Sequence, residues 1–191
     1  MELKIILSVL VLSSFMISIN DAYAADGDVT STVEINSSTT NGPTLSNSDS
    51  FGVSVANIGD LNGDGVNDIA VGAPNDDDGG DGRGAIHIMF MNTDGTVDST
   101  VEINDSTTNG PTLYDSDHFG ASVANIGDLN GDGVNDIAVG AHRGDIGGTS
   151  RGAIHIMFMN TDGTVDSTVQ IHSSTTNGPT LTNSDSFGSC L

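Results

Sequence analysis

Two nine-residue stretches of the chain place oxygen-bearing side chains at alternate positions. Asp60 to Asp68 reads Asp-Leu-Asn-Gly-Asp-Gly-Val-Asn-Asp, and the same residues return at Asp128 to Asp136. Calcium takes roughly six to eight oxygen ligands, and a loop can supply them from alternate positions, one through a backbone carbonyl. The pattern therefore predicts two Ca²⁺ sites. The predicted ligands are Asp60, Asn62, Asp64, Val66 (backbone) and Asp68 in the first loop, and Asp128, Asn130, Asp132, Val134 (backbone) and Asp136 in the second.

The residues after each loop distinguish it from an EF-hand. An EF-hand closes with a bidentate Glu at its last position, and this chain has Val71 or Val139 there. The apolar run from Asp68 to Ala73 ends in Gly-Ala and indicates a strand rather than a helix. A calcium loop between two strands is the preferred interpretation. A turn that binds nothing is the alternative, because Asp, Asn and Gly also favour turns for backbone reasons.

The loops belong to a longer repeat with a period of 68 residues. Ser31-Thr32-Val33-Glu34-Ile35-Asn36 returns at Ser99 to Asn104 and, with two changes, at Ser167 to His172. Turn signals separate the predicted strands, including Asn92 to Gly95, where Asp-Gly indicates a hairpin. Four strands repeated in tandem predict a propeller blade. The expected strands of one unit are about Gly52 to Ile58, Asp68 to Ala73, Gly84 to Met91, and Val97 to Ile103.

Three separated elements resemble the FG-GAP repeat family, which includes the N-terminal β-propeller of integrin α chains. They are Phe51-Gly52, the loop at Asp60 to Asp68, and Gly72-Ala73-Pro74; the second unit has Phe119-Gly120, Asp128 to Asp136, and Gly140-Ala141-His142. The resemblance implies propeller blades with calcium loops on one face and ligand recognition on the other. It also implies calcium contacts at the ten residues named above.

The expected fold is all-β, a partial β-propeller of two complete four-stranded blades with flanking strands of incomplete blades. Because repeat units gain stability from their neighbours, we expect self-association of this chain or a place in a larger propeller. The expected divisions are a signal peptide (1–24), an N-terminal segment with the last strand of an incomplete blade (25–50), the first blade (51–104), a link (105–118), the second blade (119–172) and the start of a truncated third blade (173–191).

The N-terminal segment and the net charge indicate where the protein is located and what it binds. Lys4, the apolar stretch Ile5 to Ile19 and Ala22-Tyr23-Ala24 have the form of a cleaved signal peptide, which predicts a secreted or cell-surface protein with no membrane span after cleavage. An uncleaved anchor is less favoured, because the stretch is short and interrupted by serines. The net charge of −22 repels nucleic acids and anionic membranes and favours cations as partners.

The two units differ mainly in two segments. Aligning residues 31–98 with 99–166 gives 11 differences, of which ten fall in 74–82/142–150 and 37–50/105–118. In a four-stranded meander these segments emerge on one face, which predicts a recognition surface for an extracellular protein or glycan; general tolerance of loops to change is the alternative. This face includes Arg143-Gly144-Asp145, a tripeptide bound by many integrins, and the acidic residues Asp76, Asp77, Asp78 and Asp81. The aspartates predict either a further cation site or a solvated acidic loop.

The sequence favours a binding protein over an enzyme. His87 and His155 lie within predicted strands as packed residues, and there is no GxSxG, HExxH or Walker motif. The preferred hypothesis is a secreted, calcium-binding module for adhesion or extracellular recognition. Two alternatives are the non-catalytic propeller portion of a larger secreted hydrolase and a structural surface-array protein.

Overall fold

The computed structural model describes residue 29 and residues 31–191, and the predicted signal segment, 1–24, lies outside them. Residues 33–191 form one compact unit, and the described strands all belong to it. Across the described residues, no helix has the length and apolar character needed to cross a membrane.

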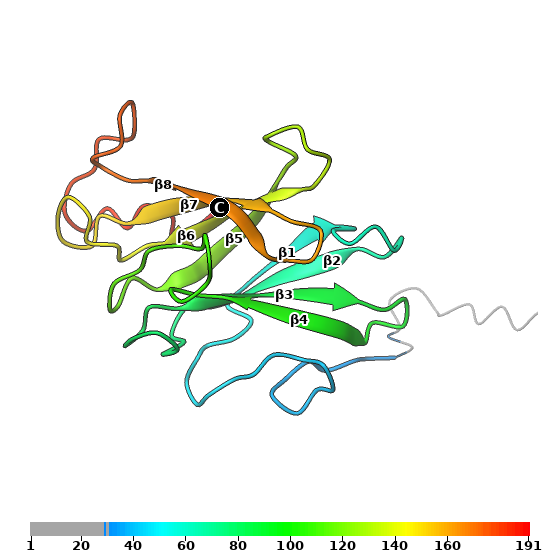
Figure 1. The fold of residues 1–191 in the computed structure, drawn as a ribbon. Helices are drawn as coiled ribbons and strands as arrows, with labels where there is room; N and C mark the ends of the chain where they lie inside the picture. Colours follow the sequence, from blue (N-terminus) through cyan, green and yellow to red (C-terminus); the bar gives the residue numbers. More distant parts are fainter. Residues whose placement is uncertain (1–28, 30) are drawn as a thin grey trace, which may run out of the picture. The chain divides into compact units, whose positions relative to one another are not determined.

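Eight strands form two four-stranded antiparallel sheets, each with its strands in chain order (Figure 1). This all-β arrangement of two complete blades confirms the predicted fold class, and the strands of the first blade lie within two residues of the expected ones. The first sheet contains β1 (Ser54–Gly59), β2 (Asp68–Ala73), β3 (Ala85–Met91) and β4 (Val97–Ile103). The second contains β5 (Phe119–Gly127), β6 (Asp136–Ala141), β7 (Ala153–Met159) and β8 (Val165–Ile171).

The predicted hairpin joins β3 to β4. The N–H of Asn92 donates to the Thr96 carbonyl at 2.8 Å, and the N–H of Gly95 donates to the Asn92 carbonyl at 2.9 Å. Gly95 has a φ of 83°, which glycine adopts without the steric cost of a Cβ. The Asp-Gly signal in the sequence therefore located this turn correctly.

The larger hydrophobic core lies between the two sheets. β5 packs against β1, β2 and β3 of the preceding blade. Phe119 at the start of β5 is fully buried in a cluster that includes Ile58 and Ile86 of the first blade and Ile137 and Met157 of the second. Burial of each such side chain stabilises the fold by about 1.5–3 kcal/mol. The two blades therefore share one core.

The strands β3 and β7 have the same sequence, Ala-Ile-His-Ile-Met-Phe-Met, but different burial. Every residue of β3 except Met91 is buried, whereas in β7 buried and half-buried residues alternate. Because successive side chains of a strand point to opposite faces, β3 is covered on both faces and β7 on one. Ile86 and Ile88 face the second blade, while Ile35 and Phe51 pack on the other face of the first sheet.

Equivalent apolar residues differ in exposure for the same reason. Val55 is 60% exposed, but Val123, which occupies the same place in the second blade, is 7% exposed against the first. Leu61 is 3% exposed because the second blade covers it, while the equivalent Leu129 is 60% exposed. The pair of blades therefore presents an uncovered apolar surface on each side.

The glycines of the repeat allow the start of one blade to lie against the backbone of the blade before it. The Oγ of Ser54 donates to the Gly120 carbonyl at 2.8 Å, and the N–H of Phe119 donates to the Arg83 carbonyl at 2.9 Å. A Cβ on Gly72 would lie 1.9 Å from the Gly120 oxygen, and one on Gly84 would lie 2.2 Å from the Phe119 oxygen. Both positions therefore exclude any side chain.

The start of the third unit repeats this contact on the second blade. The Oγ of Ser122 donates to the Gly188 carbonyl at 2.7 Å, and the N–H of Phe187 donates to the Arg151 carbonyl at 2.9 Å. A Cβ on Gly140 would lie 1.9 Å from the Gly188 oxygen. The same interface is therefore built twice from the same residue types.

The flanking segments differ from the expectation that they form strands. Among the described residues, 31–36 and 173–191 contain no strand, and Phe187 makes only an isolated parallel bridge with Gly152. The copies of the first segment at residues 99–104 and 167–172 supply most of β4 and β8, which pair with β3 and β7 of their own blades. Residues 31–36 lack such a preceding strand among the described residues, so their β-sequence is not sufficient to form a strand.

We predict that Gly72→Ala will destabilise the contact between the blades. The added methyl group would overlap the Gly120 carbonyl, and overpacking of this kind costs about 1–3 kcal/mol. The measurement is the urea midpoint of unfolding, which should fall.

Gly144→Ala is the matched control. Its added Cβ would lie 3.3 Å from the nearest atom, and the first unit already carries a side chain, Asp76, at the equivalent position. This variant should unfold within about 0.5 kcal/mol of the unmodified chain. Equal midpoints for Gly72→Ala and Gly144→Ala would contradict the proposed role of the close approach.

Candidate functional site

The loop between β1 and β2 is curled around the side chain of Asp60. Its Oδ1 accepts the N–H groups of Gly63 at 2.8 Å and Asp64 at 2.9 Å, and its Oδ2 accepts that of Gly65 at 2.9 Å. Gly63 and Gly65 have φ values of 81° and 92°, which bring their N–H groups inward at no steric cost. One carboxylate thus organises the loop.

Asn62 and Asp64 continue the same pattern. The Oδ1 of Asn62 accepts the Asp64 N–H at 3.0 Å, and the Oδ1 of Asp64 accepts the Val66 N–H at 2.8 Å. The Nδ2 of Asn62 also donates to the Oδ2 of Asp64 at 3.0 Å. Asp60, Asn62 and Asp64 are all exposed, whereas Val66 is half-buried. Three predicted ligands therefore share one exposed turn.

Asp68 is placed differently, because it is fully buried at the start of β2. Its Oδ2 accepts the Leu61 N–H at 2.9 Å, and its Oδ1 accepts the Met91 N–H at 3.1 Å. Burial raises the pKa of Asp68, these N–H groups lower it, and the nearby Asp64 carboxylate raises it further. Asp68 thus fastens the end of the loop to the hairpin after β3.

The second loop, between β5 and β6, reproduces this arrangement. Asp128 accepts the N–H groups of Gly131, Asp132 and Gly133 at 2.7, 3.0 and 2.9 Å, and the N–H of Gly133 makes the largest contribution to lowering its pKa. Asn130, Asp132 and Val134 repeat the bonds of their counterparts. The buried Asp136 accepts the N–H groups of Leu129 at 2.8 Å and Met159 at 3.1 Å.

The donor set of each loop suits a hard divalent cation. Carboxylate, amide and carbonyl oxygens are the ligands that calcium takes, and all five predicted ligands of a loop offer one. The three acidic side chains of a loop are not gathered tightly, because backbone N–H groups hold Asp60 and Asp68. Among the described residues, the one group of three acidic side chains with ligand atoms within 4.8 Å of one another lies elsewhere, at Asp76, Asp78 and Glu102.

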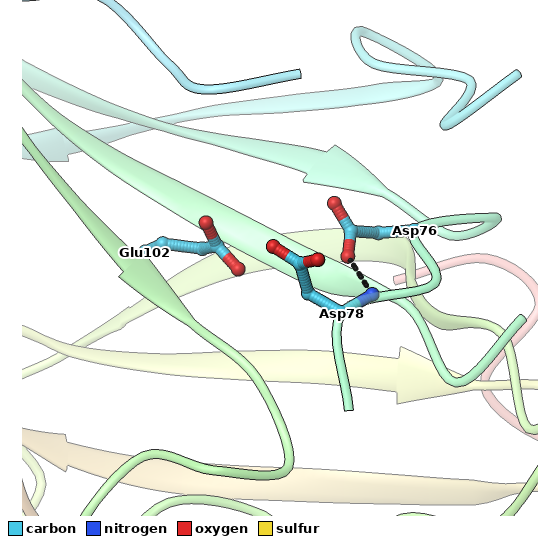
Figure 2. Close-up of side chains that lie close together, drawn as sticks. All are labelled: Asp76, Asp78 and Glu102. Atoms are coloured by element: carbon cyan, nitrogen blue, oxygen red, sulfur yellow. Dashed lines mark hydrogen bonds between the residues drawn. The ribbon is translucent and has the colours of Figure 1, made fainter. Parts of the chain in front are cut away.

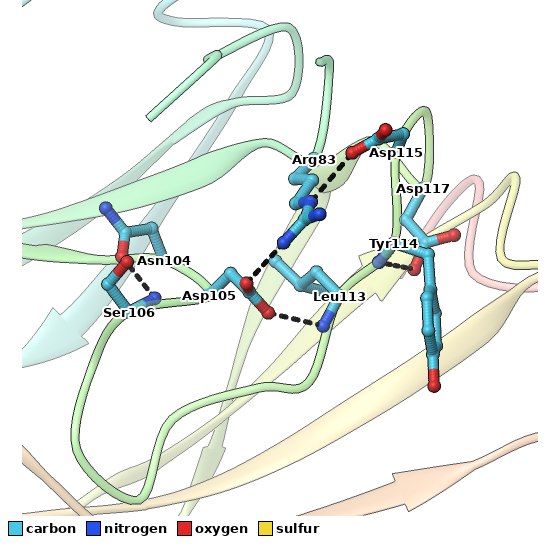
Figure 3. A network of polar contacts seen from close by, with 8 residues as sticks. All are labelled: Arg83, Asn104, Asp105, Ser106, Leu113, Tyr114, Asp115 and Asp117. Carbon is cyan, nitrogen blue, oxygen red and sulfur yellow. Dashed lines mark hydrogen bonds and ion pairs between the residues drawn. The ribbon is translucent and has the colours of Figure 1, made fainter. Parts of the chain in front are cut away.

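The variable segment 74–82 of the first unit and the variable link 105–118 are connected through Arg83, which reaches two aspartates of the link (Figure 3). Arg83 donates from Nη1 to Asp105 at 2.5 Å and from Nε to Asp115 at 2.9 Å. The Ser116 N–H also donates to the Asp81 carbonyl at 2.7 Å. The segments 74–82 and 105–118, which hold most of the differences between the units, therefore share one face.

An open pocket of about 300 Å³ lies on this face, lined by Tyr114, Asp145 and Ile146. Tyr114 is 55% exposed. Asp145 belongs to the Arg143-Gly144-Asp145 tripeptide, and its Oδ1 accepts the Ser150 N–H at 2.6 Å, which holds the carboxylate within its own loop. The pocket therefore lies between the link 105–118 and the variable segment 142–150.

The sequence motifs did not identify two buried aspartates, Asp49 and Asp117. Asp49 accepts the Ser46 N–H at 2.5 Å and Asp117 accepts the Tyr114 N–H at 2.9 Å, each shaping the link before a blade. Both are buried, at 4% and 2% exposure. Their identity in the two units, in a stretch where three of the five residues 46–50 and 114–118 differ, was the signal that could have identified them.

The strand histidines are packed residues, as expected. His87 is fully buried with its ring 5.5 Å from that of Phe51, and His155 is 1% exposed with its ring 5.3 Å from that of Phe119. Burial lowers the pKa of each to about 4. Both imidazoles are therefore neutral near pH 7.

The loop, the Phe-Gly start and the Gly-Ala end of β2 recur in both blades and are the elements that resemble FG-GAP repeats. The FG-GAP repeat model matches residues 51–89 and 119–157, so the chain contains two such repeats. It is similar to integrin α chains. It is 47% identical over 100 residues to integrin alpha-6 of Homo sapiens and 37% identical over 97 residues to integrin alpha-PS5 of Drosophila melanogaster.

These matches cover half of the chain and a small part of each relative. The match to integrin alpha-6 covers 51% of this chain and 8% of that protein, and the match to integrin alpha-PS5 covers 51% and 9%. A third match, to integrin alpha-2 of Mus musculus, is 33% identical over 100 residues and covers 52% and 8%. The chain thus spans less than a tenth of the length of these relatives.

Proposed function

We propose that the chain is an extracellular recognition or adhesion module whose FG-GAP blades are stabilised by calcium. The observation that carries this proposal is the repetition of one loop geometry around the same oxygen donors in both blades. A turn that binds nothing requires only its hydrogen bonds. Asp64 and Asp132 accept hydrogen bonds within their turns, but a neutral side-chain oxygen could accept the same N–H groups, so an exposed carboxylate at both positions favours a cation.

Calcium would be held by the residues predicted from the sequence. Asp60, Asn62 and Asp64 supply side-chain oxygens, Val66 supplies its carbonyl, and Asp68 supplies the free lone pairs of its carboxylate; Asp128, Asn130, Asp132, Val134 and Asp136 do the same in the second loop. The cation would neutralise carboxylates that otherwise repel one another. Asp68 would then act both as a ligand and as the anchor of the loop.

An extracellular location follows from three properties considered together. Residues 1–24 have the form of a signal peptide. Extracellular calcium saturates weak sites of this kind. The similar proteins are integrin α chains, which supports a place at the cell surface and a role in adhesion rather than catalysis. The neutral, packed histidines of the strands also favour binding over acid–base chemistry.

We predict that the chain binds two calcium ions and that binding stabilises it. A ligand that binds only the folded state adds about 2.7 kcal/mol at a hundredfold excess over its dissociation constant. Calorimetric titration should give two sites, and Asp64→Ala should remove one of them while leaving the Asp132 site. An unfolding midpoint that does not respond to calcium or EDTA would contradict the proposal.

A pair of variants separates the metal-binding role of the loop from its structural role. In EDTA, Asp68→Asn should lower the free energy of unfolding by about 1–3 kcal/mol, because one buried backbone N–H loses its acceptor. Asp64→Asn is exposed and should change stability little under the same conditions. Equal stability of the two variants in EDTA would show that Asp68 is not an anchor.

The recognition surface is proposed to be the variable face, at residues 74–83, 113–118 and 142–151. We predict that Tyr114→Ala and Ile146→Ala will weaken binding to partners found on arrays of glycans and extracellular matrix proteins by about tenfold, because both line the pocket. Thr161→Ala, in the exposed hairpin after β7, is the control and should bind normally. The same loss in Thr161→Ala, with folding retained, would place recognition elsewhere.

The uncovered sides of the two blades are proposed to be covered by further blades, either from a second copy of this chain or from the rest of a larger propeller. We predict self-association of the purified chain through Leu129 and Val169, which are 60% and 50% exposed. Leu129→Glu combined with Val169→Glu should reduce the mass measured by light scattering, whereas Thr161→Glu should not. A folded, unmodified monomer that binds no hydrophobic dye would refute this prediction.

A further inference from the structure

Three carboxylates from two separate segments meet beside the first blade (Figure 2). Asp76 and Asp78 lie in the loop after β2, Glu102 lies on β4, and their oxygens come within 4.8 Å of one another. Asp76 is 2% exposed and accepts the Asp78 N–H at 2.8 Å. The close approach therefore involves one almost fully buried carboxylate.

No positive side chain compensates this charge among the described residues. The only Arg–carboxylate pairs there, from Arg83, go to Asp105 and Asp115. Burial raises the pKa of Asp76 to about 6, with smaller contributions from Glu102, Asp49 and Asp78. Burial also raises the pKa of Glu102. Asp78 is exposed and Glu102 is half-buried, so the cost of gathering the three charges falls mainly on the buried Asp76, and a bound cation would reduce it.

A buried imidazole lies on the same face of the sheet as Glu102. His87 on β3 is paired in register with Glu102 on β4, so both side chains lie on the same face of the sheet. His87 is fully buried, and neither Nδ1 nor Nε2 has a hydrogen-bond partner. The negative charge of Asp78 acts on this ring. His87 is therefore a buried side chain on the Glu102 face of the sheet whose ring nitrogens the hydrogen bonds of the fold leave unused.

The second blade lacks this combination. His155 replaces His87, but Gly144, Ile146 and Gln170 stand at the positions of Asp76, Asp78 and Glu102. Gln170 lies in contact with His155, with Nε2 atoms 3.4 Å apart. All three acidic residues are thus replaced at once where the imidazole is retained. The three carboxylates therefore occur together in the first blade and are absent together from the second.

We propose that Asp76, Asp78, Glu102 and His87 form a binding site for a divalent transition-metal ion such as Zn²⁺, distinct from the two calcium loops. Zn²⁺ accepts carboxylate and imidazole ligands in fourfold coordination, whereas calcium takes oxygen ligands alone. The site needs residues from β3, β4 and the loop after β2. A bound ion would therefore connect the variable loop to the sheet.

The test is calorimetric titration of the full chain with Zn²⁺ in saturating calcium. His118 and His142 have rings 5.4 Å apart and offer competing nitrogens, so the titration uses His118→Ser with His142→Pro. Both replacements are the residues of the first unit, Ser50 and Pro74. In this background Glu102→Gln should weaken Zn²⁺ binding by at least about tenfold. Gln is the native residue at position 170, so the variant should fold.

Asp81→Asn is the matched control. It removes one negative charge from the same loop outside the cluster and should leave Zn²⁺ affinity within about twofold. Nitrogen NMR should show that Zn²⁺ shifts the imidazole resonances of His87 and not those of His155, and that Glu102→Gln abolishes the shift. Equal affinities for Glu102→Gln and Asp81→Asn would overturn the proposal. Unshifted His87 resonances at saturating Zn²⁺ would also overturn it.

Discussion

The rest of the structure depends on one constraint. The first residues of a blade must lie directly against the backbone of the preceding blade. Gly72 and Gly84 leave room for the Phe119–Gly120 backbone, which allows Phe119 to fill the core between the sheets. The same contact fixes the position at which the variable link, residues 105–118, leads into β5, because the Phe119 N–H donates to the Arg83 carbonyl. A close backbone contact at these glycines thus determines both the core and the position of the variable face.

The acidic loops at residues 60–68 and 128–136 depend on this frame through their last residue. Asp68 and Asp136 are buried and bond to the N–H groups of Met91 and Met159 at the ends of β3 and β7. The exposed part of each loop, from Asp60 or Asp128 onward, is therefore supported by a rigid sheet. A metal site on such a support keeps its ligands near their binding geometry.

The sequence predicted the strands and the repeat because those depend on local patterns. Turn residues bounded each strand, and the Asp-Gly signal located the hairpin correctly. The strand expected within residues 25–50 is absent from the described part of that segment, because strand formation also needs a pairing partner. The cluster of Asp76, Asp78 and Glu102 was predicted only in part, because Glu102 comes from a strand distant in sequence and only the fold brings it near the loop. Asp77 and Asp81, which adjoin these aspartates in sequence, lie outside the cluster.

The identical strands β3 and β7 show that one heptapeptide is compatible with two environments. Ile154, Ile156 and Phe158 remain half-buried where their counterparts in β3 are covered, so the second blade already presents the surface that the first blade uses to receive a neighbour. A further unit could be added by gene duplication without any change to the existing blades. The blade sequences therefore place no limit on the number of units, and closure of a ring must be set by the angle between neighbouring blades.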